Sequence, residues 1–329
     1  MIATPVEAEL VDRLRKVDER LEVRFEPELL PPPRFPSDHI GDPSFSRTPE
    51  EERRFADLVA GAEVLYGFPR EDSQQIAWAV RLAPGLRYVQ ATFAGAGQQL
   101  AAAGLSREEL ERIQWASSAG VHATPLAEWS IFGILAFTKG LPRLLADQRD
   151  RHWDHYPVDE LRGSTVLVVG LGSIGSEVAR LAEAFGMNVV SVRREHGDLD
   201  ELLPQADSIV VTLPLTEETR GLIDRSRIER MRPGAIFVNV GRGGVVDEEA
   251  LADALRSGHL RGAALDVFTQ EPLPPENPLW ELENVILSPH TMALSRHENE
   301  RIIELFADNL RRYLRGDELR SRIQTSLFY

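Results

Sequence analysis

Short apolar runs alternate with helix-like segments through the second half of the chain. The runs fall at residues 166–169, 188–192, 208–211, 235–238, 262–265 and 284–287. Runs of this length, apolar at nearly every position, are typical of strands that are buried on both faces of a parallel sheet. One intervening segment begins after Asp247, a favourable N-cap residue, and ends just before Gly258, which predicts a helix. The alternation predicts an α/β fold with a doubly wound parallel sheet.

The first half of the chain shows the same alternation less regularly. Four further short strands are predicted at residues 21–25, 62–66, 87–91 and 112–115. The proline-rich stretch 31–36 cannot form regular structure, because proline lacks an N–H group and has a fixed φ angle. We therefore expect the segment 31–50 to be a long irregular loop.

One helix-like segment is apolar on almost every face. Thr124-Pro125 predicts its start, since threonine can cap a helix and proline suits the first turn. The residues that follow, 126–137, contain Glu128 as their one charged side chain. A helix that is apolar all round must be buried, so we expect it to lie between domains or between subunits. This pattern favours a homodimer.

Composition narrows the class of protein. The 329 residues are enough for two domains with full cores, and no run of about 18 apolar residues predicts a transmembrane helix. The N-terminus lacks the basic and apolar blocks of a signal peptide. There is no cysteine, which excludes a disulfide or a thiolate metal site, and we expect no metal. A net charge of −15 argues against nucleic-acid binding, so we expect a cytoplasmic protein with a small-molecule partner and no membrane association.

The segment 166–175 carries the first candidate chemistry. Its apolar run leads into Gly-x-Gly-x-x-Gly, and a helix-like segment follows. Gly170 permits a tight turn, Gly172 lets the backbone approach a pyrophosphate, and Gly175 lets the helix pack closely on the strand. The helix start offers free N–H groups and a partial positive charge to the anion. These features predict a dinucleotide site; the alternative is a glycine-rich turn that binds nothing.

The end of the next predicted strand indicates which dinucleotide is bound. An Asp or Glu normally stands about 20 residues beyond the glycines and accepts hydrogen bonds from the ribose of NAD. Here Arg193 and Arg194 occupy that place, and a guanidinium can hold a 2′-phosphate through paired donors. We therefore expect NADP. NAD would be the cofactor if Glu195 accepted the hydrogen bonds of the ribose instead. The alternative is that these two arginines stand there by chance, since arginine is frequent in this chain. The 37 basic residues include two lysines, Lys16 and Lys139, which leaves 35 arginines.

Several further motifs occur in a characteristic order. After the glycine loop they are Thr212-Leu213-Pro214, Asn239-Val240-Gly241-Arg242-Gly243, Leu265-Asp266-Val267-Phe268, Glu271-Pro272, Asn277-Pro278-Leu279-Trp280 and Ser288-Pro289-His290. In this order the chain resembles the D-isomer-specific 2-hydroxyacid dehydrogenases over nearly its whole length. Pro278-Leu279-Trp280 and Arg193-Arg194 look most like the NADP-preferring glyoxylate/hydroxypyruvate reductase branch of that family.

The resemblance implies a fold of two Rossmann-like, doubly wound parallel-sheet domains with a cleft between them. The substrate domain would comprise residues 1–120 and 297–329, and the dinucleotide-binding domain residues 121–296.

Three side chains fit the reduction of a 2-keto acid. His290 follows a strand and can give a proton, because an imidazole titrates near neutral pH. Glu271 would hold the imidazole through a hydrogen bond. Arg242 would bind the substrate carboxylate with its planar fork and polarise the carbonyl group. Each of these residues on its own would predict no function. Their occurrence in this order of motifs is what predicts a catalytic set.

The resemblance extends the candidate site. It implies that Asp266 contacts the nicotinamide carboxamide. The predicted cofactor-binding residues are Gly170, Gly172, Ser173, Ile174, Gly175, Arg193, Arg194, Thr212, Pro214, Val240, Gly241 and Asp266. Substrate would be bound by Arg242, His290 and the loop at Ala94 and Gly95, which could offer backbone N–H groups to a carboxylate.

Two alternatives differ in class from a 2-keto acid reductase. A cofactor-sensing binding protein would need the dinucleotide groove alone, so the presence of Arg242, Glu271 and His290 argues against it. A dehydrogenase on the same scaffold could instead oxidise a substrate that is not a 2-hydroxy acid.

Overall fold

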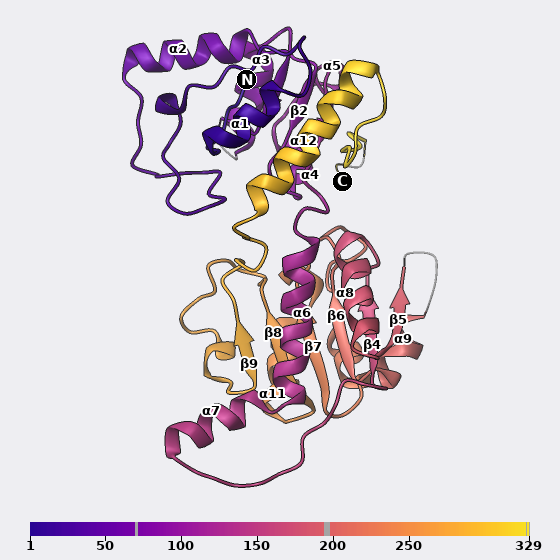
Figure 1. Cartoon of the computed structure of the whole chain (residues 1–329). Coiled ribbons are helices and arrows are strands. Elements are labelled where there is room, and N and C mark those ends of the chain that lie inside the picture. The colour runs from indigo at the N-terminus through magenta and orange to yellow at the C-terminus, as the bar shows by residue number, and fades with distance from the viewer. Residues whose placement is uncertain (70–71, 194–197, 327, 329) are drawn as a thin grey trace. The chain divides into compact units, whose positions relative to one another are not determined.

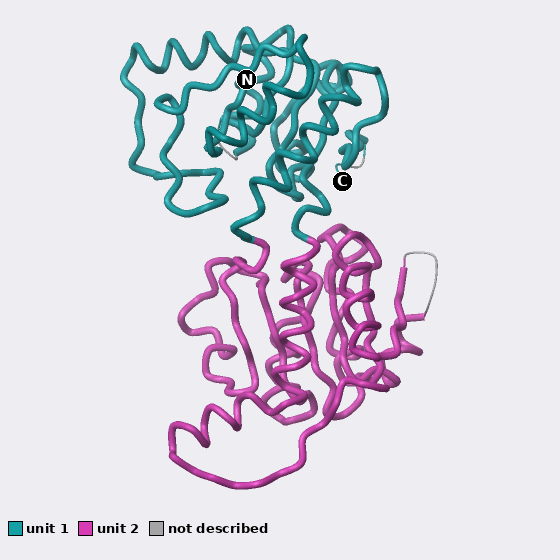
Figure 2. The backbone as a smooth tube through the Cα atoms, viewed as in Figure 1, with its two compact units in different colours: residues 1–122, 294–329 teal, residues 123–293 magenta. Residues whose placement is uncertain are grey.

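The computed structural model describes residues 1–69, 72–193, 198–326 and 328 (Figure 1). It divides into two compact units, which Figure 2 colours separately. Unit 1 comprises residues 1–122 and 294–329, and unit 2 comprises residues 123–293. The chain therefore enters unit 2 after His122 and returns to unit 1 after Ala293. None of the described helices is both long and apolar enough to cross a membrane.

Unit 2 is built on a six-stranded sheet in the order β5-β4-β6-β7-β8-β9, with every pair of neighbours parallel. The strands are β4 (Thr165–Val169), β5 (Asn188–Val192), β6 (Ser208–Val211), β7 (Ala235–Asn239), β8 (Leu260–Leu265) and β9 (Val285–Leu287). The helices are α6 (Ala123–Thr138), α7 (Leu141–Asp150), α8 (Ser173–Ala184), α9 (Leu199–Leu202), α10 (Arg225–Arg230) and α11 (Glu248–Arg256). All six strands predicted for this half are confirmed.

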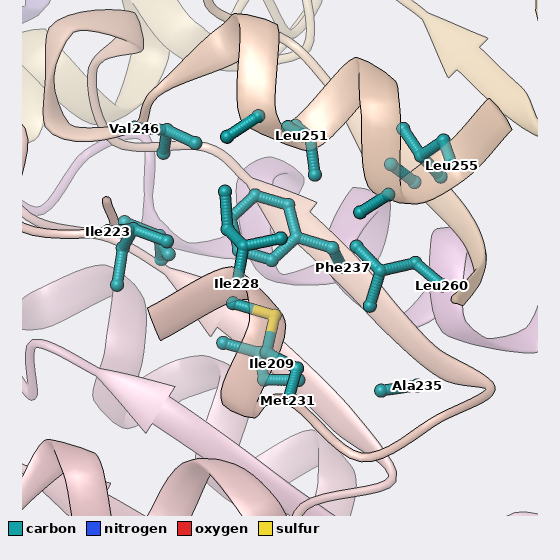
Figure 3. Packing of buried hydrophobic residues seen from close by; sticks show 14 of the residues in the cluster. Ile209, Ile223, Ile228, Met231, Ala235, Phe237, Val246, Leu251, Leu255 and Leu260 are labelled. Atoms are coloured by element: carbon teal, nitrogen blue, oxygen red, sulfur yellow. The ribbon is translucent and has the colours of Figure 1, made fainter. Parts of the chain in front are cut away.

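The strands of unit 2 are apolar at successive positions because each face of the sheet meets its own core. In β4, Leu167 and Val169 belong to one buried cluster, whereas Val166 and Val168 belong to another. Figure 3 shows the first cluster, in which Phe237 of β7 is surrounded by side chains of neighbouring strands and helices. Burial on both faces explains why the sequence shows continuous apolar runs here.

The helix boundaries in unit 2 follow from local chemistry, with one correction. Asp247 caps α11 by accepting a hydrogen bond from Ala250 N at 3.0 Å, and Gly258 beyond its end has φ 76°, as predicted. The predicted cap Thr124 is wrong, because α6 begins at Ala123 and therefore contains Thr124 in its first turn. Pro125 is compatible with this start, since the N–H groups of a first turn have no intrahelical acceptor.

Helix α6 packs on the sheet of its own unit. A Cβ added at Gly133 would lie 2.5 Å from Ala264 Cβ, so this glycine allows the helix to approach β8 closely. Leu126, Ile131 and Ile134 are buried in the same cluster as Val166 and Val168 of β4. Phe132 remains 44% exposed, although the ring of Trp129 packs against it with the ring centroids 5.4 Å apart.

Unit 1 contains a parallel three-stranded sheet in the order β1-β2-β3. Its strands are β1 (Val64–Tyr66), β2 (Tyr88–Gln90) and β3 (Gln114–Ala116). Its helices are α1 (Ala8–Arg15), α2 (Pro49–Ala60), α3 (Ser73–Leu82), α4 (Ala96–Ala102), α5 (Arg107–Arg112) and the C-terminal α12 (Glu298–Arg315). Together the two parallel sheets confirm the predicted α/β class.

The predicted strand at 21–25 is wrong. The N-terminal residues take the place beside β1, through Tyr66 N to Met1 O at 3.0 Å and Ala3 N to Tyr66 O at 2.9 Å. The segment 21–25 then contributes a bond from Ile2 N to Arg24 O outside the sheet. Residues 31–36 are irregular, as expected.

Candidate active site

Five loops of unit 2 leave the same edge of its sheet. The strands are parallel, so the carboxyl ends of β4, β6, β7, β8 and β9 lie together. The residues that follow these ends include Gly170, Thr212, Arg242, Asp266 and His290, in that order. The chain proceeds from β4 outward to β5 and then back to β6 on the other side of β4. Open α/β sheets bind ligands at such a switch point, outside the carboxyl ends of the strands.

The glycine loop after β4 has the geometry of a phosphate cradle. Gly170 has φ 99°, in the region that favours glycine. A Cβ at Gly175 would lie 2.0 Å from the carbonyl oxygen of Gly170, so a larger residue would push α8 off the strand. A Cβ at Gly172 would meet nothing within 4 Å, which shows that this glycine faces open space. Gly172 is the N-cap of α8, and no side chain in the described part of the chain caps it.

The loop after β6 supports the glycine loop. Thr212 Oγ1 donates to Gly170 O at 2.7 Å, and the side chain of Leu213 lies against the position where Gly170 would carry a Cβ. The backbone of Leu213 also approaches Gly241, whose added Cβ would lie 2.5 Å from Leu213 O. Val240, beside Gly241, is buried. The loops after β4, β6 and β7 therefore pack on one another through glycines.

Arg193 lies next to this loop in the fold. It directly follows β5, whose last residue, Val192, accepts a hydrogen bond from Gly170 N at 3.1 Å. The Arg193 side chain is exposed. Arg194 and Glu195, which the cofactor prediction also names, lie outside the described residues.

His290 and Glu271 form a direct pair. His290 Nδ1 lies 2.8 Å from Glu271 Oε2, and Glu271 Oε1 accepts a hydrogen bond from Phe268 N at 2.9 Å. The carboxylate is therefore fixed by the backbone on one oxygen and orients the imidazole with the other. His290 itself has φ 52°, an uncommon angle for a residue other than glycine. With Nδ1 directed at Glu271, Nε2 is the ring nitrogen on the side away from the carboxylate.

Asp266 is buried beneath the turn that carries His290. Its Oδ1 accepts hydrogen bonds from Thr291 N at 3.0 Å and Met292 N at 3.2 Å. Burial raises the pKa of Asp266, and its hydrogen bonds act in the opposite direction. This carboxyl group therefore holds the backbone just after His290, a positioning role that the sequence did not suggest.

Arg242 is held by its own loop. Asn239, at the end of β7, accepts from Gly241 N at 3.0 Å and donates through Nδ2 to Arg242 O at 3.2 Å. Arg242 Nη1 donates to Gly241 O at 2.7 Å. Burial lowers the pKa of Arg242, whereas the negative charge of Glu271 raises it. Since a guanidinium stays charged in proteins, Arg242 brings a fixed positive charge to the neighbourhood of Glu271.

Asn239 belongs to the motif of residues 239–243, and no function was predicted for it from the sequence. The available signal was its type and place, because a polar side chain at the end of a strand buried on both faces must find hydrogen-bond partners. Its 2% exposure and two backbone bonds show where those partners are.

The substrate loop belongs to unit 1. Ala94 and Gly95 follow β2, and Gly95 is the N-cap residue of α4, which has no side-chain cap among the described residues. Phe93 O accepts a hydrogen bond from Ser118 N at 3.3 Å, which ties this loop to the segment after β3. In the part of the chain that the structure describes, no group of three acidic or histidine side chains could hold a metal ion.

Comparison with known proteins identifies the class. Residues 131–292 match the model of the D-isomer specific 2-hydroxyacid dehydrogenase, NAD binding domain. A putative 2-hydroxyacid dehydrogenase of Haemophilus influenzae is 37% identical over 263 residues, which cover 73% of this chain and 78% of that protein. The chain therefore belongs to the D-isomer specific 2-hydroxyacid dehydrogenase family, which confirms the resemblance predicted from its motifs.

Individual relatives carry more specific names. A glyoxylate reductase of Korarchaeum cryptofilum is 43% identical over 170 residues, 48% of this chain and 51% of that protein, so the match spans about half of that relative's length. A D-isomer specific 2-hydroxyacid dehydrogenase of Xanthobacter autotrophicus, solved with NADPH, superposes with a TM-score of 0.76 at 27% identity, covering 99% of this chain and 97% of that one. An NADPH-dependent glyoxylate/hydroxypyruvate reductase of Sinorhizobium meliloti, solved with NADP, has a TM-score of 0.71 at 26% identity, covering 82% and 87%.

Proposed function

We propose that this protein reduces a small 2-keto acid, of the glyoxylate or hydroxypyruvate type, to the D-2-hydroxy acid with NADPH. The observation that carries the proposal is the His290–Glu271 pair, at 2.8 Å, with Arg242 electrostatically coupled to Glu271 at the same sheet edge as the glycine loop. Two of the relatives described above support the choice of substrate by their names, and two solved structures support NADPH by their bound cofactors.

The residues of the glycine loop suit a dinucleotide. Added side chains at Gly170 and Gly241 would collide with the loop after β6, and one at Gly175 would collide with Gly170, whereas Gly172 faces open space at the start of α8. In this proposal the cofactor is held by Gly170, Gly172, Ser173, Ile174, Gly175, Thr212, Pro214, Val240, Gly241 and Asp266, with Arg193 and Arg194 at the 2′-phosphate. When bound, the nicotinamide supplies a hydride.

The side chains of the chain itself perform the remaining steps. Arg242 binds the substrate carboxylate through paired N–H donors and polarises the adjacent carbonyl group. As the carbonyl carbon accepts the hydride, the electron pair of the C=O bond moves to oxygen, which takes a proton from His290 Nε2. The imidazole is left neutral and regains a proton from solvent. Glu271 keeps the ring oriented and stabilises its charged form before the transfer.

The two units would divide this work. We assign dinucleotide binding to unit 2 and a substrate-domain role to unit 1, where the backbone N–H groups near Ala94 and Gly95 would meet a carboxylate. The domain limits expected from the sequence, 1–120 with 297–329 and 121–296, differ from the limits of the two units by two or three residues.

We also propose a homodimer that buries one face of α6. Phe132 of α6, Leu144 and Leu145 of α7, and Trp153 are all large apolar side chains that unit 2 leaves exposed, Trp153 by 89%. Exposed apolar side chains on neighbouring elements are typical of association surfaces.

A direct assay tests the reaction. Purified protein is mixed with NADPH or NADH and with glyoxylate, hydroxypyruvate, pyruvate or phenylpyruvate, and loss of the reduced-cofactor absorbance is followed. We expect turnover with NADPH and the two smallest polar keto acids. The variant His290→Ala should lose about 10²- to 10⁴-fold in kcat while it still binds NADPH. His259→Ala is the matched control, because His259 precedes β8 at the amino edge of the sheet and its ring contacts Ile228 O at 3.2 Å.

The outcomes separate the alternatives. If no keto acid is reduced but NADPH still binds, the reductase proposal is wrong and the cofactor-sensing alternative gains. Turnover of a substrate without a 2-keto group would favour a different dehydrogenase on the same scaffold.

A further inference from the structure

A second cluster of titratable side chains lies in unit 1, apart from the candidate active site. His122 is the last residue of unit 1 before the chain enters unit 2, and Glu298 begins α12 soon after the chain returns. His122 Nε2 lies 2.9 Å from Glu298 Oε1, although 176 residues separate the two in sequence. His39, from the irregular segment 31–50, has its Nε2 3.6 Å from the same oxygen. One carboxylate oxygen therefore faces two imidazole rings.

This cluster is nearly removed from solvent. The exposed fractions of the side chains are 11% for His122, 7% for His39 and 4% for Glu298. A buried carboxylate is costly unless a cation and hydrogen bonds compensate for the lost water. Burial by itself would raise the pKa of Glu298, but hydrogen bonds and charge from His122 and His39 bring it below its usual value. The lowered pKa favours the ionised form of Glu298, and a protonated imidazole beside it would supply the compensating charge.

The cluster joins segments that are far apart in the chain. Ser37 Oγ donates to Ser295 O at 2.8 Å, which fastens the irregular segment to the stretch where the chain returns to unit 1. Thr4 Oγ1 donates to His39 O at 2.6 Å and ties the same segment to the N-terminus. We call the two places where the chain passes between the units, after His122 and before Leu294, the chain crossings. The His122–Glu298 contact and these hydrogen bonds connect both chain crossings to the rest of unit 1.

The other charged groups around the cluster do not change their charge near neutral pH. Glu7 precedes α1 and accepts from Asn299 Nδ2 at 2.8 Å, and Arg301 stands one turn further along α12. Carboxylates and guanidinium groups ordinarily stay ionised between about pH 6 and 8. Burial raises the pKa of Tyr66, on β1, far above its usual value, so its hydroxyl stays neutral. Imidazole is the group whose charge changes in this range.

We propose that His122, His39 and Glu298 form a proton-dependent latch that holds the two chain crossings of unit 1 together. With a protonated imidazole, the ion pair fixes the end of the first crossing to the start of α12. When both imidazoles are neutral, Glu298 is left as a buried carboxylate without a countercharge. The backbone around the two chain crossings then opens more often and exchanges its amide protons faster. This device is independent of the proposed reaction, because none of the three side chains belongs to the candidate active site.

Hydrogen exchange on the full chain tests the latch. Mass spectrometry of peptides that cover residues 118–124 and 294–300 is compared at about pH 6 and 8, after correction for the intrinsic pH dependence of exchange. We expect the protection of both peptides to fall by about 10- to 100-fold at the higher pH, the scale of a hydrogen bond to a charged group. His122→Gln keeps an amide in place of the ring but cannot be charged, so its protection should be low and the same at both values.

His297→Gln is the matched control, because this neighbouring histidine is 72% exposed and lies 3.9 Å from Glu300 rather than in the cluster. It should behave as the unaltered protein does. If the unaltered protein shows equal protection at both pH values, the latch does not exist, and this comparison needs no variant to fold. A His122→Gln variant that retains the full pH response would also overturn the proposal.

Discussion

Replacing Asn239 by alanine should separate the geometry of the candidate active site from the stability of unit 2. The Asn239 side chain is buried at the end of β7 and makes two backbone hydrogen bonds, from Gly241 N at 3.0 Å and to Arg242 O at 3.2 Å. Alanine removes both bonds and leaves the buried N–H of Gly241 without this partner. The loop that carries Arg242 would then lose the contacts that define its path.

The size of the effect follows from these two bonds. A buried donor left without a partner costs about 1–3 kcal/mol, and the second bond adds about 0.5–1.5 kcal/mol, so we expect a loss of about 1.5–4.5 kcal/mol. For a unit of this size that corresponds to a fall of roughly 3–18 °C in Tm. A displacement of Arg242 by about 1 Å should lower kcat/KM by about 10- to 100-fold.

Thermal unfolding and steady-state kinetics with NADPH and the best keto acid measure the two effects. The matched control is Asn284→Ala, which removes the bond from Asn284 Nδ2 to Leu255 O at 3.0 Å, at the amino edge of the same sheet. It should lower Tm to a smaller extent and leave kcat/KM within about twofold. If Asn239→Ala and Asn284→Ala reduce kcat/KM equally, Asn239 has no special role in placing Arg242.

Three further predictions address the cofactor and the assembly. Arg193→Asp should replace a side chain that binds the 2′-phosphate by one that accepts hydrogen bonds from the ribose, and should raise the NADH/NADPH ratio of kcat/KM by about 10- to 200-fold. An unchanged ratio would mean that another residue determines the cofactor preference. Gly175→Ala places a Cβ 2.0 Å from Gly170 O, so it should cost about 1–3 kcal/mol in thermal unfolding and weaken NADPH binding in a fluorescence titration; normal binding would contradict the cradle. Phe132→Asp should convert the dimer to a monomer in light scattering, and a monomer before the substitution would refute the dimer itself.

The sheet of unit 2 could be predicted because its signals are local. Each of its strands is apolar over consecutive residues, and caps such as Asp247 act within one turn. In unit 1 the strand predicted at 21–25 failed for a non-local reason. The alternation of side chains there is compatible with a strand, but residues 1–3 already pair with β1. Pairing partners are chosen in three dimensions, so the pattern of one segment cannot decide them.

The candidate site divides in the same way. Residue type and motif order identified Arg242, Glu271 and His290, because the proposed chemistry needs a cation, a carboxylate and an imidazole. The tertiary structure decided that Glu271 faces His290 Nδ1, that Asp266 supports the turn after His290, and that Asn239 holds the Arg242 loop.

Sequence alone thus determined the family and the α/β class and predicted the residue types of the candidate site, since each of these depends on short stretches of the chain. Only the folded chain decided how distant residues meet. His122 and Glu298 are 176 positions apart and lie in no shared motif, yet a buried carboxylate must find a partner wherever the fold provides one. Desolvation acts on three-dimensional neighbours, and for that reason the buried polar contacts could be known only from the tertiary structure.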